Sequence, residues 1–360
     1  MLRTGGFKHF LRNHVRGISA KQKNNFFRQL AILTHAGIGI LDALKMLQKS
    51  ARGNIKYLIS DSIILIEQGY DFSRIGLFYT KFFDKTTIAM ISAGEKSGNL
   101  PQVFRQVHYL LEKKRKFKSK IKGAMMMPMF TLVFAIGVVF FMAIKVIPEF
   151  AKFLSAMGAD LPLLTQYVLD ISKYILEHWK TIFTYIGVSI STVVVVYMSS
   201  KPVRYILDYI LIYLPLVGGI SLYGNLSNFS SNMSKLYASG VNLVDCLSIS
   251  SDGVSLLPFQ KVANTAKETI ISGGYFYDSF KKSPFIPIIF SDILQAGEQS
   301  GSLDHAFEQL ALIYEEEANV KIAVLQAAIP PIMTILIGAL VGVIAASLIM
   351  GMIALWGAQG

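Results

Sequence analysis

Three long stretches of the chain are apolar and contain no charged residue, and they restrict the folds that it can adopt. They are residues 124–144, 181–198 and 322–360. The hydrocarbon core of a bilayer is crossed by about 20 helical residues, so each stretch is long enough to span it. A helix also satisfies its own backbone N–H and C=O groups in lipid. The sequence therefore predicts an all-α, polytopic membrane protein with three transmembrane helices.

The last apolar stretch contains 39 residues, which is more than one simple span requires. We expect its first part to lie outside the lipid and to be separated from the span by a kink at Pro330 and Pro331. Residues 203–223 are a further apolar segment, but Arg204 and Asp208 lie within it. A charge at membrane depth costs about 3 kcal/mol on insertion scales, so this segment is predicted to be an interfacial or bundle helix.

The chain is also internally duplicated, at an offset of 203 residues. The segment AGEKSGNL at residues 93–100 matches AGEQSGSL at residues 296–303, and Pro128 matches Pro331. Each half therefore consists of one soluble helical domain followed by a span that starts near a proline. Two such domains lie on one side of a membrane only if an even number of spans separates them. Two spans between the domains satisfy that condition.

The charge distribution predicts the orientation. The formal net charge is +12, but residues 1–123 carry +16 and residues 199–360 carry −4. The basic run at residues 113–122 directly precedes the first span, and Lys/Arg-rich flanks stay in the cytoplasm. The N-terminus is therefore predicted to be cytoplasmic and the C-terminus periplasmic.

These observations predict seven consecutive regions. They are a basic N-terminal arm, a cytoplasmic domain, a span, a periplasmic loop, a second span, a second cytoplasmic domain and a third span. Their expected ranges are, in that order, 1–20, 21–123, 124–144, 145–180, 181–198, 199–328 and 329–356.

The duplicated AGExSGxL segment is the first candidate functional site. Its second glycine suits the left-handed residue that ends a helix, and its glutamate can bond inside the bundle. The segment is therefore interpreted as a tight turn between helices, and the alternative is a surface that contacts a partner. The candidate residues are Gly94, Glu95, Ser97 and Gly98, with Gly297, Glu298, Ser300 and Gly301 in the second copy.

The two halves differ in charge over one matched segment, residues 113–116 in copy one and 316–319 in copy two. Copy one has Lys113, Lys114, Arg115 and Lys116 where copy two has Glu316, Glu317 and two uncharged residues, directly after Glu315. Topology explains the basic run, but acidic residues contribute little to orientation. We therefore expect the acidic helix to face a basic surface, which is domain one of the same or a neighbouring protomer, or a partner.

The last span contains small residues at helical spacing. Gly338 and Gly342 form a GxxxG pattern, which permits close approach of helices. Together with Pro128 and Pro331, these glycines are predicted to serve transmembrane packing, either within the chain or as a groove for the transmembrane helix of another protein.

Several chemistries are not supported. The Lys96-Ser97 pair lacks both glycines of a P-loop, so no nucleotide is expected to bind there. The six histidines form no H-E-x-x-H pair, and one cysteine cannot build a Cys-rich metal site. We therefore expect no enzyme activity, cofactor, metal or nucleic-acid partner. The alternative function is a membrane transporter or channel component, although the spans contain no ionisable residue.

The duplication, the repeated AGExSGxL motif, the basic helix before Pro128 and the three predicted spans together resemble the GspF/PilC family of type IV pilus and type II secretion platform proteins. The resemblance implies a bacterial inner-membrane protein that couples a cytoplasmic assembly ATPase to (pseudo)pilin subunits. It also implies contacts with other inner-membrane assembly proteins, and a homodimer or higher homo-oligomer.

Overall fold

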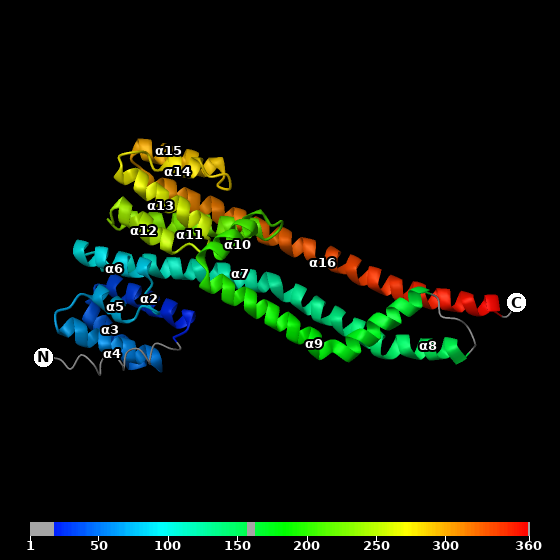
Figure 1. Cartoon of the computed structure of the whole chain (residues 1–360). Helices are drawn as coiled ribbons and strands as arrows, with labels where there is room; N and C mark the ends of the chain where they lie inside the picture. The colour runs from blue at the N-terminus through cyan, green and yellow to red at the C-terminus, as the bar shows by residue number, and fades with distance from the viewer. Residues whose placement is uncertain (1–17, 157–162, 359–360) are drawn as a thin grey trace. The chain divides into compact units, whose positions relative to one another are not determined.

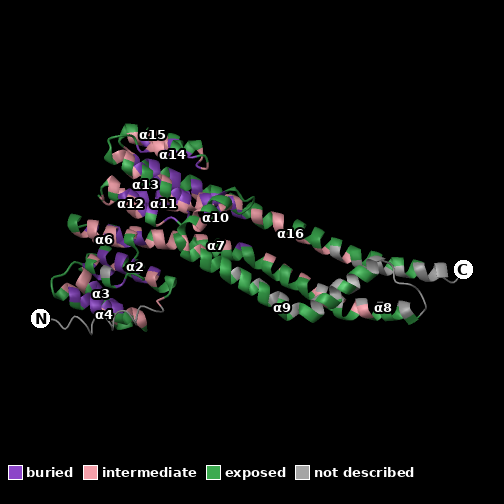
Figure 2. Cartoon of the chain, in the orientation of Figure 1, coloured by how far each residue is buried: buried purple, intermediate pink, exposed green. Residues whose placement is uncertain are grey.

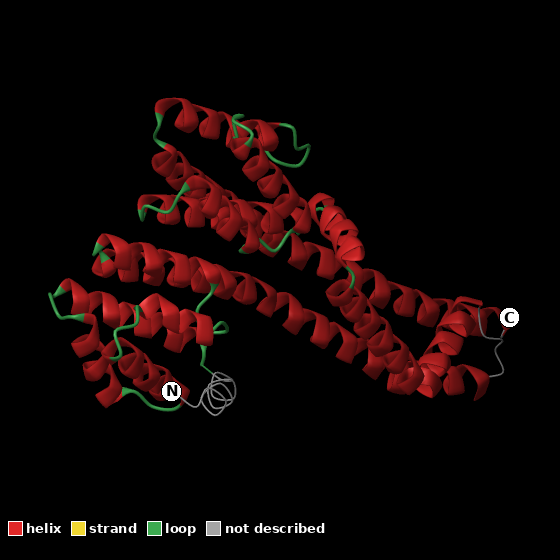
Figure 3. Cartoon of the chain, turned by 60° about the vertical axis from the view of Figure 1, so that its left-hand side comes forward, coloured by secondary structure: helices red, strands yellow, loops and turns green. Residues whose placement is uncertain are grey.

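The computed structural model of the chain describes residues 18–156 and 163–358, which contain helices and no strand (Figure 3). The greater part of the predicted basic arm, residues 1–17, lies outside the described residues. The chain divides into two compact units. One is formed by residues up to Ser119 together with Asp208–Asn319, and the other by Lys120–Leu207 together with the residues from Val320 onward.

The first unit contains both halves of the duplication, which we call domain 1 (residues 18–119) and domain 2 (residues 208–319). Domain 1 is a bundle of short helices (Figure 1). Its elements are α2 Ala20–His35, α3 Ile40–Ser50, α4 Asn54–Glu67, η1 Phe72–Arg74, α5 Ile75–Phe78, α6 Lys85–Ser97 and the start of α7 Leu100–Phe141.

Local sequence explains where these helices begin. Ser19 caps α2 by accepting a bond from the Gln22 backbone N–H, while the Gln22 side chain accepts one from the Ser19 N–H. Asp84 caps α6 through the Thr87 N–H at 2.9 Å. Buried residues gather on the inner faces of these helices (Figure 2). Aromatic rings fill the centre of the bundle. The central rings belong to Phe26, Phe27, Phe72, Phe83 and Phe104, all at most 2% exposed.

Domain 2 repeats this bundle with its own core. Its elements are the end of α10 Lys201–Tyr213, then α11 Gly218–Ala238, α12 Leu243–Asp252, α13 Leu257–Ile271, α14 Tyr277–Lys281, α15 Ile288–Ser300 and the start of α16 Leu303–Ala358. Phe229, Phe259, Phe280 and Phe307 are fully buried, and their rings contact one another. Phe229 and Phe307 are the counterparts of Phe26 and Phe104, so the duplication repeats the centre of the core.

The second unit contains two of the expected boundaries. Residues 145–180 were expected to be a periplasmic loop between two spans, and their described part is helical: the π-helical turn η2 Met142–Val146 is followed by α8 Ile147–Ala156 and by α9 Leu163–Ser199. The domain ends expected at residues 123 and 328 also fall inside continuous helices, α7 and α16. No new helix begins at either expected boundary.

The prolines do not interrupt these helices. Pro128 lies inside α7, and Pro330 and Pro331, where a kink was expected, lie inside α16. A proline removes one backbone hydrogen bond, and helices at membrane depth tolerate this loss because nearby groups satisfy the freed carbonyl. The carbonyls that lose a backbone partner are those of Ala124, Gln326 and Ala327, four residues before the prolines. The nearby Thr131 and Thr334 hydroxyls donate to other carbonyls, those of Met127 and Pro330.

Two helices in the described part of the chain are long and apolar enough to cross a membrane, within Leu100–Val138 and Leu303–Val343. The second predicted span corresponds to a shorter apolar helical stretch, Gly187–Ser199. By length and composition, the bent pair α10 and α11 is a further candidate if it is counted as one span, and these two helices meet at 107°.

The bent pair, with the break between its two helices, contains residues 203–223, the segment that the sequence predicted to be an interfacial or bundle helix. Leu216, at the break, has a φ of +69°, and α11 then buries Leu226, Phe229 and Met233 in the core of domain 2. Asp208, on α10, is 2% exposed, and its carboxylate accepts a bond of 3.0 Å from the Leu257 N–H at the start of α13. This acid therefore fixes one helix against the start of another within domain 2.

Candidate functional site

The repeated AGExSGxL segment has the same backbone geometry in both domains. Helices α6 and α15 end at Gly98 and Gly301, each with a φ of +71°. Residues that carry a Cβ rarely adopt this left-handed backbone conformation, whereas glycine adopts it at little cost. The chain then turns and begins the next helix. Ser97 and Ser300 each donate a long bond of 3.4 Å to the carbonyl of the first glycine of the motif.

The first glycine of the motif brings two helices together. A Cβ on Gly94 would lie 2.6 Å from Val103 Cγ2, and a Cβ on Gly297 would lie 2.4 Å from the Ala306 Cβ. These separations are far below a van der Waals contact. Both glycines therefore allow the helix before the turn to pack directly on the helix after it.

The motif glutamate bonds inside each bundle. Glu95 accepts from the Phe72 N–H and, at 3.1 Å, from the Ser73 N–H, at the start of η1. Glu298 accepts from the Phe276 and Tyr277 N–H groups at 3.3 and 3.4 Å, and burial raises the pKa of its carboxyl although these bonds oppose the rise. Negative charge at the first N–H groups of a helical segment is favourable. The motif thus acts as a structural turn in both copies.

We expect Glu95→Ala to lower the free energy of unfolding of the full chain by about 2 kcal/mol, because two backbone N–H groups lose their acceptor. Glu298→Ala is expected to cost less, because its bonds are longer. Glu95→Gln, which retains an acceptor, is the control. Chemical denaturation, monitored by far-ultraviolet circular dichroism, measures the difference in the free energy of unfolding. Equal losses for Glu95→Ala and Glu95→Gln would contradict this role.

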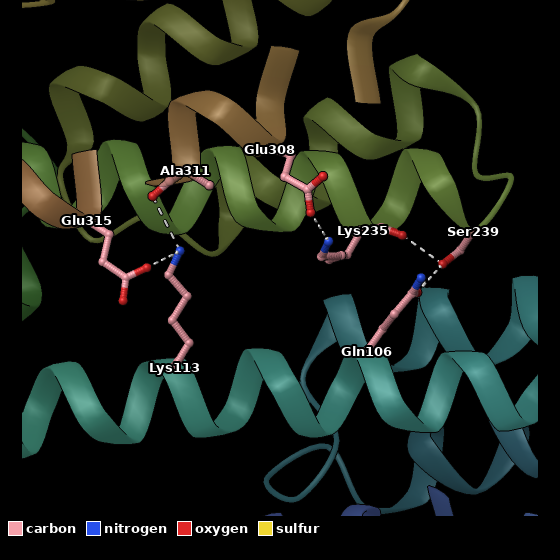
Figure 4. Close-up of polar contacts among 7 residues, drawn as sticks. All are labelled: Gln106, Lys113, Lys235, Ser239, Glu308, Ala311 and Glu315. Carbon is pink, nitrogen blue, oxygen red and sulfur yellow. Dashed lines mark hydrogen bonds and ion pairs between the residues drawn. The ribbon is translucent and has the colours of Figure 1, made fainter. Parts of the chain in front are cut away.

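Domains 1 and 2 contact each other through charged and polar side chains (Figure 4). Lys113 Nζ, on α7, lies 3.0 Å from Glu315 Oε2 and 3.4 Å from the Ala311 carbonyl, both on α16. Ser239 donates to Gln106 Oε1 at 2.8 Å, and the Lys235 ammonium lies 5.8 Å from the centre of the Tyr109 ring. The basic helix and the acidic helix that differ in charge between the copies therefore meet within one chain, at one ion pair.

The polar stretch of α11 is covered by this contact. Ser227 and Ser231 are 5% and 3% exposed, and Ser227 donates to the Ala311 carbonyl at 2.8 Å. A Cβ on Gly224 would lie 2.7 Å from the Phe117 ring of α7. Small side chains let α7 approach α11 closely. This explains why copy two has small residues where copy one has exposed ones such as Arg28.

The other residues of the predicted charged surfaces stay at the surface. Lys114, Lys116, Glu316 and Glu317 are exposed, and Lys114 borders a cavity of about 530 Å³ between the domains. Asp252 also borders the cavity and pairs with Lys85 at 2.5 Å across its edge. Both partners of that pair are well exposed, so it contributes at most about 1 kcal/mol.

Sequence reasoning missed a polar cluster on α2 and α7 of domain 1. His108 Nδ1 lies 2.7 Å from Asn24 Oδ1, and the Asn24 amide donates to Glu112. Arg115 binds Glu112 through two donors, and this hydrogen bonding lowers the pKa of the Glu112 carboxyl to about 2. Burial lowers the pKa of His108 despite Glu112 nearby. These partners are up to 88 residues apart, and no local pattern indicates their proximity.

The two glycines of the GxxxG pattern have open surroundings. Outside the backbone of their own helix, no described atom lies within 4 Å of a Cβ built on Gly338 or Gly342, and both glycines are exposed. Among the described residues the GxxxG pattern therefore does not pack inside the chain. Its partner-groove interpretation remains a proposal.

The described residues contain no group of three or more His, Cys, Asp or Glu side chains placed to hold a metal ion. The described features are instead a turn that occurs in both domains, a contact between the two domains, and long apolar helices. The sequence profile of the type II secretion system protein F family matches the chain twice, over residues 26–148 and 229–351. The chain belongs to this family. The two matches are themselves offset by 203 residues and so confirm the duplication.

Individual relatives agree with this assignment and with the resemblance seen in the sequence. The chain is similar to the type IV pilus assembly protein PilC of Thermus thermophilus, at 30% identity over 335 residues, 92% of this chain and 82% of that protein. PilC of Pseudomonas aeruginosa is 28% identical over 318 residues, 88% and 85% of the two chains. The type II secretion system protein F of Vibrio cholerae is 28% identical over 291 residues, 80% and 71% of the two chains.

Proposed function

We propose that this member of the family is the inner-membrane platform of a type IV pilus or type II secretion system, and that it couples a cytoplasmic assembly ATPase to membrane-embedded (pseudo)pilins. The observation that carries the proposal is the continuity of two helices. Each of α7 and α16 begins in the core of a soluble domain and continues into an apolar stretch long enough to span a membrane. A force applied to either domain would act directly on such a helix.

The names of the relatives support this role, because they describe pilus assembly and type II secretion proteins. In this proposal the ATPase supplies the energy, other inner-membrane assembly proteins surround the platform, and the platform acts as a homodimer or higher homo-oligomer. No observation in the structure favours a transporter or channel.

A strain that lacks this chain tests the function. We expect it to lose surface filaments or secretion while pilin and ATPase remain at normal levels, and a plasmid copy to restore them. The tagged full chain should also co-purify the assembly ATPase from membranes treated with a cross-linker. Normal filaments and secretion in the deletion strain would contradict the proposal, whatever the outcome of purification.

We further propose that both domains are cytoplasmic, that residues 145–180 are periplasmic, and that the chain crosses the membrane three times. Reporter fusions at Ala159 and Ser251 test this topology. Alkaline phosphatase should be active at Ala159 and inactive at Ser251, because Lys/Arg-rich flanks stay inside. A cytoplasmic reporter such as green fluorescent protein should give the reverse pattern. Phosphatase activity at Ser251 would show that α10 and α11 cross the membrane.

A further inference from the structure

The contact between domains 1 and 2 has a counterpart on each domain that the chain itself does not use. Domain 1 contacts domain 2 with the outer face of α6 and α7, and domain 2 receives it on α11, α12 and one side of α16. Because the halves are offset by 203 residues, each contact position has a matched position in the other half. The matched positions form two further faces, one on each domain.

Face A lies on domain 2, at the positions that match the contact residues of domain 1. All these matched positions of domain 2 are exposed. The contact residues of domain 1 are Lys85, Gln106, Tyr109, Leu110, Lys113 and Lys114. These face A residues are, in the same order, Ile288, Gln309, Leu312, Ile313, Glu316 and Glu317.

Face B lies on domain 1, at the positions that match the receiving residues of domain 2. All these matched positions of domain 1 are also exposed. The receiving residues of domain 2 are Ser231, Asn232, Lys235, Ile249, Asp252 and Glu308. These face B residues are Arg28, Gln29, Ile32, Met46, Lys49 and Arg105.

Both faces expose apolar side chains at their centres. Ile32 and Met46 of face B are 61% and 48% exposed, and Ile288 and Leu312 of face A are 72% and 49% exposed. In the contact within the chain, the positions of Ile32 and Leu312 are occupied by Lys235 and Tyr109, which lie together. The same arrangement would place Ile32 on Leu312, which lies at the edge of the recess beside Tyr109, and would remove the exposed parts of both side chains from water.

The charges reverse on both faces together. Within the chain, domain 1 is basic at Lys113 and Lys114, and domain 2 is acidic at Asp252. Face A instead carries Glu316 and Glu317, and face B carries Lys49. A contact between faces A and B would therefore be complementary with the opposite polarity, and face B adds Arg28 and Arg105. No ion pair in the described part of the chain involves these five residues.

The side-chain sizes exchange in the same way. The large Tyr109 of domain 1 packs beside the small Ser231 of domain 2, and both border the same recess. In face A the matched residue is the smaller Leu312, and in face B it is the larger Arg28. A compensating change on both sides keeps the volume available at a contact.

One matched pair is acidic on both sides. Lys113 and Glu315 form an ion pair within the chain. Lys113 matches Glu316 of domain 2, and Glu315 matches Glu112 of domain 1. Glu112, however, is already bound by Arg115 and Asn24, and Arg28 and His108 lie on the same side of domain 1. Glu316 would therefore meet a surface that is positive overall.

We propose that face A of one copy of this chain binds face B of a second copy, by the same arrangement that joins domains 1 and 2 within a chain. The two faces of one chain do not meet each other, because their residues are all exposed while the two domains contact one another through other residues. The second copy is the occupant that supplies the matching charges and sizes. The proposal rests on the homo-oligomer in the proposed function, and it names the surfaces that would form it.

Cross-linking between two differently tagged full-length copies in one membrane tests the proposal. One copy carries Ile32→Cys and the other Leu312→Cys. Cys246 can remain, because it is fully buried and burial raises its pKa to about 12, which keeps the thiol unreactive. Mild oxidation should join the two tags, and each cysteine variant paired with wild type gives the background.

Charge reversal then tests the complementarity. Adding Glu316→Lys and Glu317→Lys to the Leu312→Cys copy should lower cross-linking by about tenfold, and Arg28→Glu and Lys49→Glu in the other copy should restore it. Glu268→Lys, an exposed acid on α13, is the control and should change nothing. Background cross-linking in the unreversed pair would overturn the proposal. A dimer still seen by native mass spectrometry would then leave the proposed homo-oligomer in place with a different surface.

Discussion

Gly297→Val is expected to unfold domain 2, with the free energy of unfolding falling by about 3 kcal/mol or more. The nearest atom to a Cβ at this position is the Ala306 Cβ, at 2.4 Å. That atom is attached to the backbone of α16 and cannot turn away as a long side chain does. Gly94→Val should be milder, because Val103 Cγ2 can move by rotation about χ1. Thermal unfolding of the purified chain measures both losses.

A compensating pair makes this prediction specific. Gly297→Ala alone should destabilise domain 2, and adding Ala306→Gly should recover most of the loss, because the second change removes the atom that clashes. Gly39→Val is the control, since no atom lies within 4 Å of its Cβ and its φ is negative. Wild-type stability of Gly297→Val would show that the two helices are not closely packed at the turn.

The double change Gly338→Leu and Gly342→Leu is expected to leave the chain folded and inserted but to lower filament assembly or secretion by about tenfold or more. Outside the backbone of the same helix, no described atom lies within 4 Å of either Cβ, so the first carbon of the new side chain causes no clash. They would instead fill the groove proposed for another transmembrane helix. Filament counts or secreted protein, normalised to the amount of platform in the membrane, give the readout.

Gly137 and Gly187 provide matched controls for this variant. Both lie in apolar helices, and neither has an atom within 4 Å of its Cβ. Neither glycine belongs to a GxxxG pattern, so Gly137→Leu and Gly187→Leu should leave assembly unchanged. Equal loss in all variants would point to a general effect of bulk in the membrane. Full assembly by the Gly338→Leu and Gly342→Leu chain would remove the groove from the proposed function.

A pair of helices with opposite charge shows how far sequence reasoning reached. The comparison of the two halves indicated that Glu315–Glu317 faces a basic surface, and it left open which one. The structure places Lys113 at Glu315 within the chain and leaves Glu316 and Glu317 exposed. The difference is decided by which side of α16 each residue occupies once domain 1 is in place, and three consecutive residues necessarily point to different sides of a helix.

The sequence by itself determined the features that depend on neighbouring residues or on self-comparison. The helical class follows from apolar stretches without charges, the two domains follow from the 203-residue repeat, and the helix ends at Gly98 and Gly301 follow from the conformational freedom of glycine. Each of these signals acts over a few residues or is written twice in the chain.

Tertiary structure alone decided the rest. The expected loop at residues 145–180 is helical where it is described, and α7 and α16 continue through their prolines, because neither hydropathy nor a single lost hydrogen bond fixes where a helix stops. The contacts of Asn24 with Glu112 and of Lys113 with Glu315 join residues 88 and about 200 positions apart. Such contacts depend on how whole helices pack against one another, and no short segment of sequence carries that information.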